Sequence, residues 1–238
     1  MDTQKLLSYM RQCIKKYNMI QNNDYIAVGL SGGKDSYTLL KGLTELKKFY
    51  PENYNLCAIY VDLGVENQTE NINTMKNYCD MLNVPFYVVN TDIFSIVFEE
   101  RKEKNPCALC AKMRKGALNQ KALEIGCNKI AYAHHKDDFI ETSLMSLFYE
   151  GHYYCFPPVT KLDKTGLTLI RPMFYISERE IQGYANRNSF PIMKNPCPAD
   201  GKTTRETVKQ YIKESEQTFP NIRKNLTTAL THYYEKEI

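Results

Sequence analysis

The segment Ser31-Gly32-Gly33-Lys34-Asp35-Ser36 combines residue types that suit phosphate binding. It follows an apolar run at residues 25–30 that predicts a buried strand, and it opens a helix predicted from about Asp35 to Phe49. Two glycines let the backbone turn tightly near a ligand, and the free N–H groups of a helix start attract anions. Lys34 adds a positive charge, and the serines add hydroxyl donors. The spacing is neither that of a Walker loop nor that of a Rossmann loop. The string therefore predicts another kind of phosphate loop, with an ordinary turn as the alternative.

Thiols form a second candidate group. Cys107 and Cys110 make a Cys-x-x-Cys pattern after Pro106, at the start of a predicted helix, and this pattern suits a zinc half-site, a redox pair or a cluster site. Cys197, between two prolines, is a third candidate. The chain has no second Cys-x-x-Cys pair, so a zinc site would need a histidine to complete it. The chain has eight cysteines, and the five outside this group have no motif around them and are expected to be core or surface thiols.

Acidic residues and histidines follow two of the predicted strands. His134, His135, Asp137 and Asp138 come after the strand predicted at 128–133. Carboxylates beside a nucleotide phosphate usually hold Mg²⁺, so we expect Asp137 or Asp138 to bind magnesium and His135 to lie near the reacting phosphate. The alternative is that the two carboxylates only begin a helix. Asp62 ends the strand predicted at 55–62 and is either a ribose or metal-side partner or a turn cap.

The elements that must position these residues alternate along the chain. This alternation predicts an α/β fold with a mostly parallel sheet, helices on both faces, and a ligand site beyond the carboxyl ends of the strands. The predicted strands are residues 25–30, 55–62, 85–89, 128–133 and 168–170. The predicted helices are residues 2–20, 35–49, 68–82, 92–104, 107–125, 136–149 and 177–188, with one or two more in 203–236 around Pro220.

Length and composition suit a single α/β domain with short helical extensions. The 238 residues divide into a helix at 1–20, a domain at 21–200 and a helical tail at 201–238. A net charge of +4 is weak evidence for a nucleic-acid partner. The sequence has no apolar stretch of about 20 residues and no signal-peptide pattern at its start. We therefore expect a cytoplasmic protein without a membrane partner.

Several motifs in order resemble those of one family. The string at 31–36 resembles the PP-loop of the ATP pyrophosphatase superfamily, which cleaves ATP between its α and β phosphates and adenylates a substrate. The motifs after it resemble those of the tRNA 2-thiocytidine synthetase family, from about residue 20 to about residue 200. They are Cys107-Ala-Leu-Cys110-Ala-Lys-Met-Arg114-Lys115-Gly116, Ala133-His134-His135-Lys-Asp137-Asp138-Phe-Ile-Glu141-Thr142, Arg171-Pro172-Met173, Phe190-Pro191-Ile192 and Cys197.

The resemblance implies an ATP-dependent, AMP-forming tRNA sulfurtransferase with the PP-loop, or adenine nucleotide alpha-hydrolase-like, fold. It implies ATP over Ser31–Ser36 with the adenosine near residues 60–63, and His134 and His135 facing the nucleotide. It further implies a [4Fe–4S] cluster on Cys107, Cys110 and Cys197, with one iron open to carry sulfide or a persulfide from a cysteine desulfurase. Arg114 and Lys115 would bind the RNA, and relatives are often homodimers.

The chain departs from the family pattern in two ways, and two other functions are also compatible with the sequence. The third ligand site has one cysteine where relatives often have two, and the chain is short, so the modified tRNA position is open. A zinc-bearing PP-loop ligase and a non-catalytic nucleotide- and RNA-binding module are the alternatives. In the tail, Arg205, Lys209 and Lys213 share one helix face, either for tRNA phosphates or, as is more common, for solvent.

Overall fold

A six-stranded sheet forms the centre of the computed structural model, which describes residues 1–65, 68–101, 106–193 and 204–235. The strand order is β3-β2-β1-β4-β6-β5, and every neighbouring pair is parallel except β5 with β6. The strands are β1 (Asp24–Gly29), β2 (Tyr54–Asp62), β3 (Phe86–Asn90), β4 (Lys129–Ala131), β5 (Val159–Lys161) and β6 (Thr168–Ile170). The predicted α/β fold with a mostly parallel sheet is confirmed.

Helices cover both faces of this sheet, as expected from strands that are apolar on both sides. In β1, Ile26 and Val28 face one core while Ala27 faces the other, which is the period of two of a strand. The first core contains α1 (Thr3–Lys16), α2 (Lys34–Leu46), α3 (Thr69–Met81) and α6 (Glu178–Asn188). The second core contains the π-helix η1 (Ser95–Glu100) and α4 (Pro106–Glu124).

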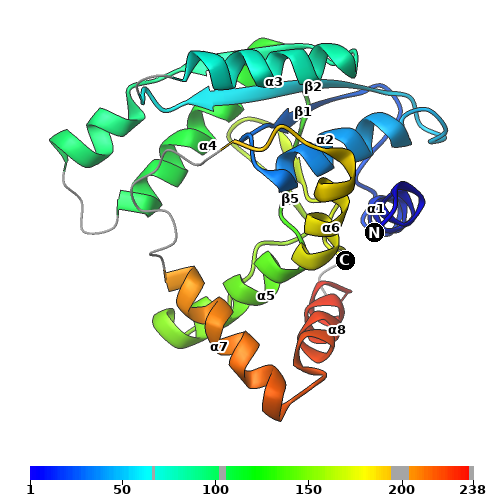
Figure 1. Cartoon of the computed structure of the whole chain (residues 1–238), viewed down its shortest axis with the longest axis vertical. Coiled ribbons are helices and arrows are strands. Elements are labelled where there is room, and N and C mark those ends of the chain that lie inside the picture. The colour runs from blue at the N-terminus through cyan, green and yellow to red at the C-terminus, as the bar shows by residue number, and fades with distance from the viewer. Residues whose placement is uncertain (66–67, 102–105, 194–203, 236–238) are drawn as a thin grey trace.

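The remaining helices form a group at the opposite end of the molecule from α3 (Figure 1). They are α5 (Lys136–Met145), its π-helical continuation η2 (Ser146–Glu150), α7 (Thr204–Thr218) and α8 (Ile222–Glu235). Aromatic rings hold the group together, because Phe139 of α5 packs against Phe174 at 4.5 Å and against Tyr234 of α8 at 6.4 Å between ring centroids. This packing fixes α7 and α8 beside the start of α5.

Three details differ from the sequence prediction. Strand β5 was not predicted, because Val159-Thr160-Lys161 has a single apolar residue and so forms no apolar run. The helix predicted at 92–104 is a short helical segment whose main part is the π-helix η1, and the second half of the helix predicted at 136–149 is the π-helix η2. The tail prediction is confirmed, with two helices on either side of Pro220. No helix among the described residues is long and apolar enough to cross a membrane.

Candidate active site

A cavity of about 550 Å³ lies at the carboxyl edge of the sheet. The strand order reverses direction between β1 and β4, and such a switch point is where open parallel sheets bind their ligands. The cavity wall is built from the ends of β1, β2, β4 and β6, from α4, and from the segment before β5. The lining residues include Ser31, Asp35, Ser36, Ile59, Val61, Arg114, Lys115, Tyr132, His134, Asp138, Tyr154, Phe156 and Arg171.

The loop between β1 and α2 has the geometry of a phosphate loop. Gly32 has φ +79°, a left-handed backbone conformation that favours glycine, and the tip of the Met193 side chain lies in the space that a Cβ atom would take. Gly33 is the N-cap of α2 and has no side chain with which to cap the helix. The hydroxyl of Ser36 accepts from the backbone N–H of Ser31 at 3.1 Å and donates to the Gly33 carbonyl at 2.9 Å. The loop is therefore preformed, and its helix start is available to an anion.

Lys34 and Asp35 belong to a charged cluster beside this loop. The Lys34 ammonium lies 3.3 Å from Asp35 Oδ2 and 3.2 Å from Glu178 Oε1 at the start of α6. Burial raises the pKa of Asp35 above its ordinary value, although the nearby charges of His135 and Lys34 oppose this. Asp35 lines the cavity, so a cation bound there would favour its ionised form.

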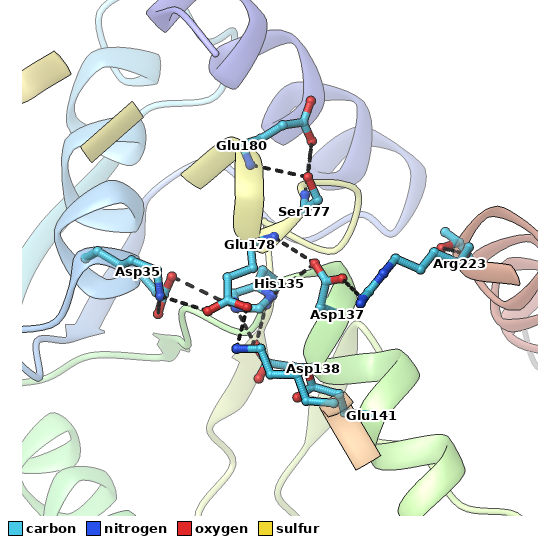
Figure 2. Close-up of polar contacts among 12 residues, drawn as sticks. Asp35, His135, Asp137, Asp138, Glu141, Ser177, Glu178, Glu180 and Arg223 are labelled. Carbon is cyan, nitrogen blue, oxygen red and sulfur yellow. Dashed lines mark hydrogen bonds and ion pairs between the residues drawn. The ribbon is translucent and has the colours of Figure 1, made fainter. Parts of the chain in front are cut away.

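The two carboxylates predicted to hold magnesium have different surroundings (Figure 2). Asp137 is buried, and its oxygens accept from the Glu178 backbone N–H at 2.7 Å and from Arg223 Nη1 at 2.6 Å. Asp138 lines the cavity, accepts from the His135 backbone N–H at 2.9 Å and lies 3.2 Å from Arg205 Nη1. Both carboxylates thus accept hydrogen bonds at helix starts, which is the role expected as the alternative to magnesium binding. Of these two carboxylates, only Asp138 lines the cavity.

The two histidines also differ. His134 lines the cavity, and burial lowers its pKa to about 4, so its ring is neutral at pH 7. His135 is buried, and its Nε2 lies 3.5 Å from Asp138 Oδ2 and 3.9 Å from Asp35 Oδ1. Consecutive residues at a strand end point to opposite sides, and it is His134 that points into the cavity.

The basic face of the tail is turned toward the site. Arg205 pairs with Glu141 at 3.0 Å as well as with Asp138, and Lys209 pairs with Glu178 at 2.6 Å. Although burial opposes it, the hydrogen bond from Lys209 and the charge of Lys34 lower the pKa of Glu178 to about 2. Arg205 and Lys209 stay partly exposed to solvent while they make these ion pairs, so part of their charge is already balanced within the protein. Lys213 is exposed.

Helix α4 supplies the wall opposite the tail. Arg114 and Lys115 line the cavity as the RNA prediction requires, one turn beyond Cys110. Cys107 is exposed and Cys110 is buried, and their i, i+3 spacing places both thiols on one face of the helix. Cys197 lies outside the described residues. Within the described part of the chain, no group of three or more His, Cys, Asp or Glu side chains is placed to hold a metal ion.

Asp62 lies at the same edge of the sheet but is not among the described cavity residues. Its Oδ1 accepts from the Gly64 backbone N–H at 3.1 Å. This contact is that of a turn cap, one of the two roles expected for Asp62.

Sequence reasoning gave no role to four residues of the wall. They are Tyr132, Tyr154, Phe156 and Arg171. Arg171 had a usable signal, since it is a basic residue directly after the predicted strand at 168–170. The two aromatic residues before β5 had none, because that strand was not predicted.

Comparison with known proteins agrees with this geometry. Residues 4–216 match the model of the PP-loop domain family. The chain is 35% identical over 230 residues to the tRNA-cytidine(32) 2-sulfurtransferase of Pelobacter propionicus, covering 95% of this chain and 85% of the relative. It is 37% identical to the enzyme of that name from Cellvibrio japonicus, covering 94% of this chain and 74% of the relative. The U34-tRNA thiolase NcsA of Methanococcus maripaludis, solved with its [4Fe–4S] cluster, superposes with a TM-score of 0.76 at 26% identity, covering 96% of this chain and 78% of that one.

The preformed phosphate loop at the switch point of a parallel sheet and the matched domain define a PP-loop protein, whose domain is an ATP-binding one. Within that class, the chain belongs to the tRNA-cytidine(32) 2-sulfurtransferase family, a family of transferase enzymes.

Proposed function

We propose that this protein is an ATP-dependent tRNA thiolase that converts a cytidine to 2-thiocytidine, at position 32 as the name of its relatives indicates. The observation that carries the proposal is the single cavity that joins the phosphate loop to the helix bearing the Cys-x-x-Cys pair. A nucleotide on one side of the cavity and a sulfur source on the other would both reach one bound base.

The phosphate side would be the ATP site. The N–H groups at the start of α2, with Ser31 and Ser36, would receive the phosphates, and Lys34 would balance their charge. The apolar side chains of Ile59 and Val61 at the end of β2 offer a surface for the adenine. Asp35 and Asp138 are the carboxylates of this region that face the cavity, and we assign magnesium to them. Asp137 already uses both oxygens in protein contacts.

The chemistry would proceed in two displacements. O2 of the cytosine attacks the α-phosphorus of ATP, the bond to the β-phosphate oxygen breaks, and pyrophosphate leaves. Hydrosulfide then attacks C2, the C2–O bond breaks, AMP leaves, and the sulfur loses its proton to give the thiocarbonyl. No electron is gained or lost overall. The chain's contribution is to hold the phosphates, shield the cavity and place the base, which must leave its stack to be reached.

The cysteine pair suits an iron–sulfur cluster. Thiolates are the usual cluster ligands. On α4, Cys110 lies about one helical turn and Cys107 about two turns before the cavity residue Arg114. The described residues near both ends of segment 194–203 contact the walls of the site, since the Met193 N–H donates to the Gly32 carbonyl at 3.0 Å and Arg205 donates to Glu141 at 3.0 Å. These contacts support Cys197 as the third ligand. A bound cluster with one open iron would supply the sulfide to the activated base.

The partners follow from this chemistry. tRNA is the substrate, with Arg114 and Lys115 in contact with it, and the sulfur would come as sulfide or as a persulfide from a cysteine desulfurase. We place the enzyme in the cytoplasm, where tRNA is modified, and propose a homodimer, which light scattering would test.

The test is thiolation by protein purified and reconstituted without oxygen. We expect iron and acid-labile sulfide in the protein and ATP-dependent 2-thiocytidine in digested tRNA. Cys107→Ala, Cys110→Ala and Cys197→Ala should each abolish the product while leaving ATP binding intact. Cys79→Ala, at a buried position of α3, is the matched control and should keep the activity. Active protein that contains zinc and no iron would replace this proposal with the zinc-ligase function.

A further inference from the structure

The inner wall of the cavity, which we define as Tyr132, His134, Phe156 and Arg171, lies beyond the phosphate loop. Tyr132 follows β4, and its N–H donates to the carbonyl of Ile170, the last residue of β6, at 3.0 Å. His134 packs against Tyr132 at 5.6 Å and against Phe156 at 4.6 Å between ring centroids. The inner wall is therefore one connected surface of rings, and the nucleotide chemistry described above uses none of it.

Arg171 is a buried cation without an acidic partner. Its residue is 5% exposed. Its Nη1 donates to the Pro157 carbonyl at 2.6 Å and to Thr160 Oγ1 at 3.0 Å, while its guanidinium lies 4.8 Å from the centre of the Phe156 ring. Within the described chain it has no salt bridge, and its Nε has no hydrogen-bond partner. A buried charge held without a counter-charge is costly, so a ligand that accepts hydrogen bonds would be favoured here.

Two polar atoms near Arg171, on Tyr132 and His134, are also buried without a hydrogen-bond partner. Nine buried side-chain nitrogen or oxygen atoms of the described residues have no partner, and four of the nine belong to residues that line the cavity. Three of these four are on the inner wall, namely Tyr132 Oη, His134 Nδ1 and Arg171 Nε. Buried polar groups are nearly always satisfied, so three unsatisfied ones on a single ring-lined surface indicate a flat ligand with a polar edge.

We propose that the inner wall holds the flipped-out cytosine base of the substrate, an assignment that rests on the proposed function. The base would pack against the rings of Phe156 and His134. Its O2 and N3 accept hydrogen bonds and would face Arg171, while its amino group donates and would face His134 or the Tyr132 hydroxyl. Stacking on aromatic rings together with hydrogen bonding along the base edge is how proteins hold unpaired RNA bases.

The position of the inner wall agrees with the reaction. Tyr132 and His134 follow β4 and Arg171 follows β6, while the phosphate loop follows β1, the other neighbour of β4. Adjacent strands lie about 4.8 Å apart, so the wall and the loop are separated by roughly 5–10 Å across the edge. A base on the inner wall would therefore reach the α-phosphate of a nucleotide on the loop. Arg171, Tyr132 and His134 become base-binding residues that set substrate specificity.

The first variant to test is Tyr132→Phe in the reconstituted holoenzyme. It removes one hydroxyl that makes no hydrogen bond within the described structure, so the fold should be unchanged. Tyr37→Phe is the matched control, because Tyr37 Oη is also buried and unsatisfied but the residue packs against Tyr78 and Phe190, away from the cavity. Arg171→Lys keeps the positive charge but removes Nε and the planar fork. ATP binding without RNA and the kcat/KM of thiolation are measured for each protein.

We expect Tyr132→Phe to lower kcat/KM for tRNA carrying cytidine at position 32 by about tenfold, as for one lost hydrogen bond. Arg171→Lys should lower it by about 100-fold. ATP binding should not change, and Tyr37→Phe should behave as wild type. Inhibition by the same tRNA with uridine at position 32 should be weaker than inhibition by an unreactive cytidine tRNA, and Arg171→Lys should reduce that difference.

Two outcomes would overturn the assignment and can be told apart. If wild type thiolates tRNA and both inner-wall variants match it in kcat/KM and base preference, the wall holds only water and the proposed function stands. If wild type forms no 2-thiocytidine with its cluster and ATP present, the proposed function itself fails. An Arg171→Lys protein that does not fold leaves the decision to Tyr132→Phe.

Discussion

The two sides of the cavity treat their buried polar groups in opposite ways. On the side of the phosphate loop, charged residues pair across elements, as in Lys34 with Glu178, Asp137 with Arg223 and Glu141 with Arg205. Only one buried oxygen there, Oδ1 of Asp35, has no hydrogen-bond partner among the described cavity residues. On the inner wall, Arg171 is more deeply buried than any of these cations, yet it pairs with no carboxylate of the described chain. The first side is organised by the protein alone, whereas the second is completed by a ligand.

This difference assigns separate roles to the two sides. The ion pairs join α2, α5 and α6 to the tail helices α7 and α8, so they fix the shape of the phosphate site before any ligand arrives. Removing one member of a buried pair leaves the other uncompensated, which costs stability. Removing an unsatisfied group of the inner wall leaves nothing uncompensated, so the cost should fall on substrate binding. The predictions below test this contrast.

The largest effect is expected at the phosphate loop. Lys34→Ala removes the cation beside the loop, and Asp35→Ala removes the carboxylate that faces the cavity. Each should lower ATP-dependent AMP formation by about 100-fold or more, the size of effect seen when a group that stabilises reacting charge is lost. Lys41→Ala is the control, because Lys41 is on the same helix and pairs only with Glu45 on its surface. AMP release at wild-type rates in both loop variants would remove the phosphate-loop assignment.

The next effect concerns the tail. Arg205→Ala leaves the carboxylate of Glu141, a residue only 3% exposed, without its cation. A fully buried pair would cost about 3–5 kcal/mol when broken; because Arg205 is about one-third exposed, we expect a loss of about 2 kcal/mol in the free energy of unfolding. Lys213→Ala, two turns along the same helix and exposed, should change it by less than about 0.5 kcal/mol. Chemical denaturation measures both, and equal values would show that the tail is held by its apolar face alone.

Sequence reasoning located the parts of the molecule that depend on local pattern. The alternation of β1 and β2, the glycines of the phosphate loop and the strand ends placed Ser31–Ser36 and His134–Asp138 at one edge of the sheet. Sequence reasoning could not predict features that depend on contacts between residues far apart in the chain. The i, i+4 spacing of Arg205 and Lys209 gives a shared helix face but not the direction in which that face points.

The two histidines and Arg171 show the same limit. A strand end predicts that His134 and His135 face opposite sides, but the register of β4 against β6 decides which of them enters the cavity. Likewise, Arg171 reads as an ordinary cation after a strand. Its special feature is the lack of a carboxylate around it in the described structure, and no local pattern records that.

A smaller effect is expected from pH. The pKa of Glu178 is about 2 in the folded protein, below its usual 4.5, because Lys209 and Lys34 outweigh the effect of burial. A carboxyl group with a lowered folded pKa contributes stability above its unfolded pKa, and this contribution is lost as pH falls from about 4.5 to 2. Wild type should therefore be more stable than Glu178→Gln at pH 7, by about 1 kcal/mol after allowance for its partial exposure. The two unfolding free energies should converge near pH 2. A difference that stays constant over this range would mean that the carboxylate charge adds nothing.

The smallest effect tests the inner wall through stability alone. Tyr54 and Tyr132 each place a hydroxyl in a buried position, but Tyr54 donates to the Leu43 carbonyl at 2.7 Å while Tyr132 has no partner. Replacing Tyr54 by Phe removes this hydrogen bond, while the Leu43 carbonyl still accepts from the Lys47 N–H at 3.0 Å, and should cost about 1 kcal/mol. Replacing Tyr132 by Phe removes an unsatisfied group, so the free energy of unfolding should stay within about 0.5 kcal/mol of wild type or rise. Thermal and urea unfolding of the two variants, without nucleotide or RNA, gives the comparison. If Tyr132→Phe loses as much stability as Tyr54→Phe, its hydroxyl is satisfied within the folded protein, and the contrast between the two sides of the cavity does not hold at that residue.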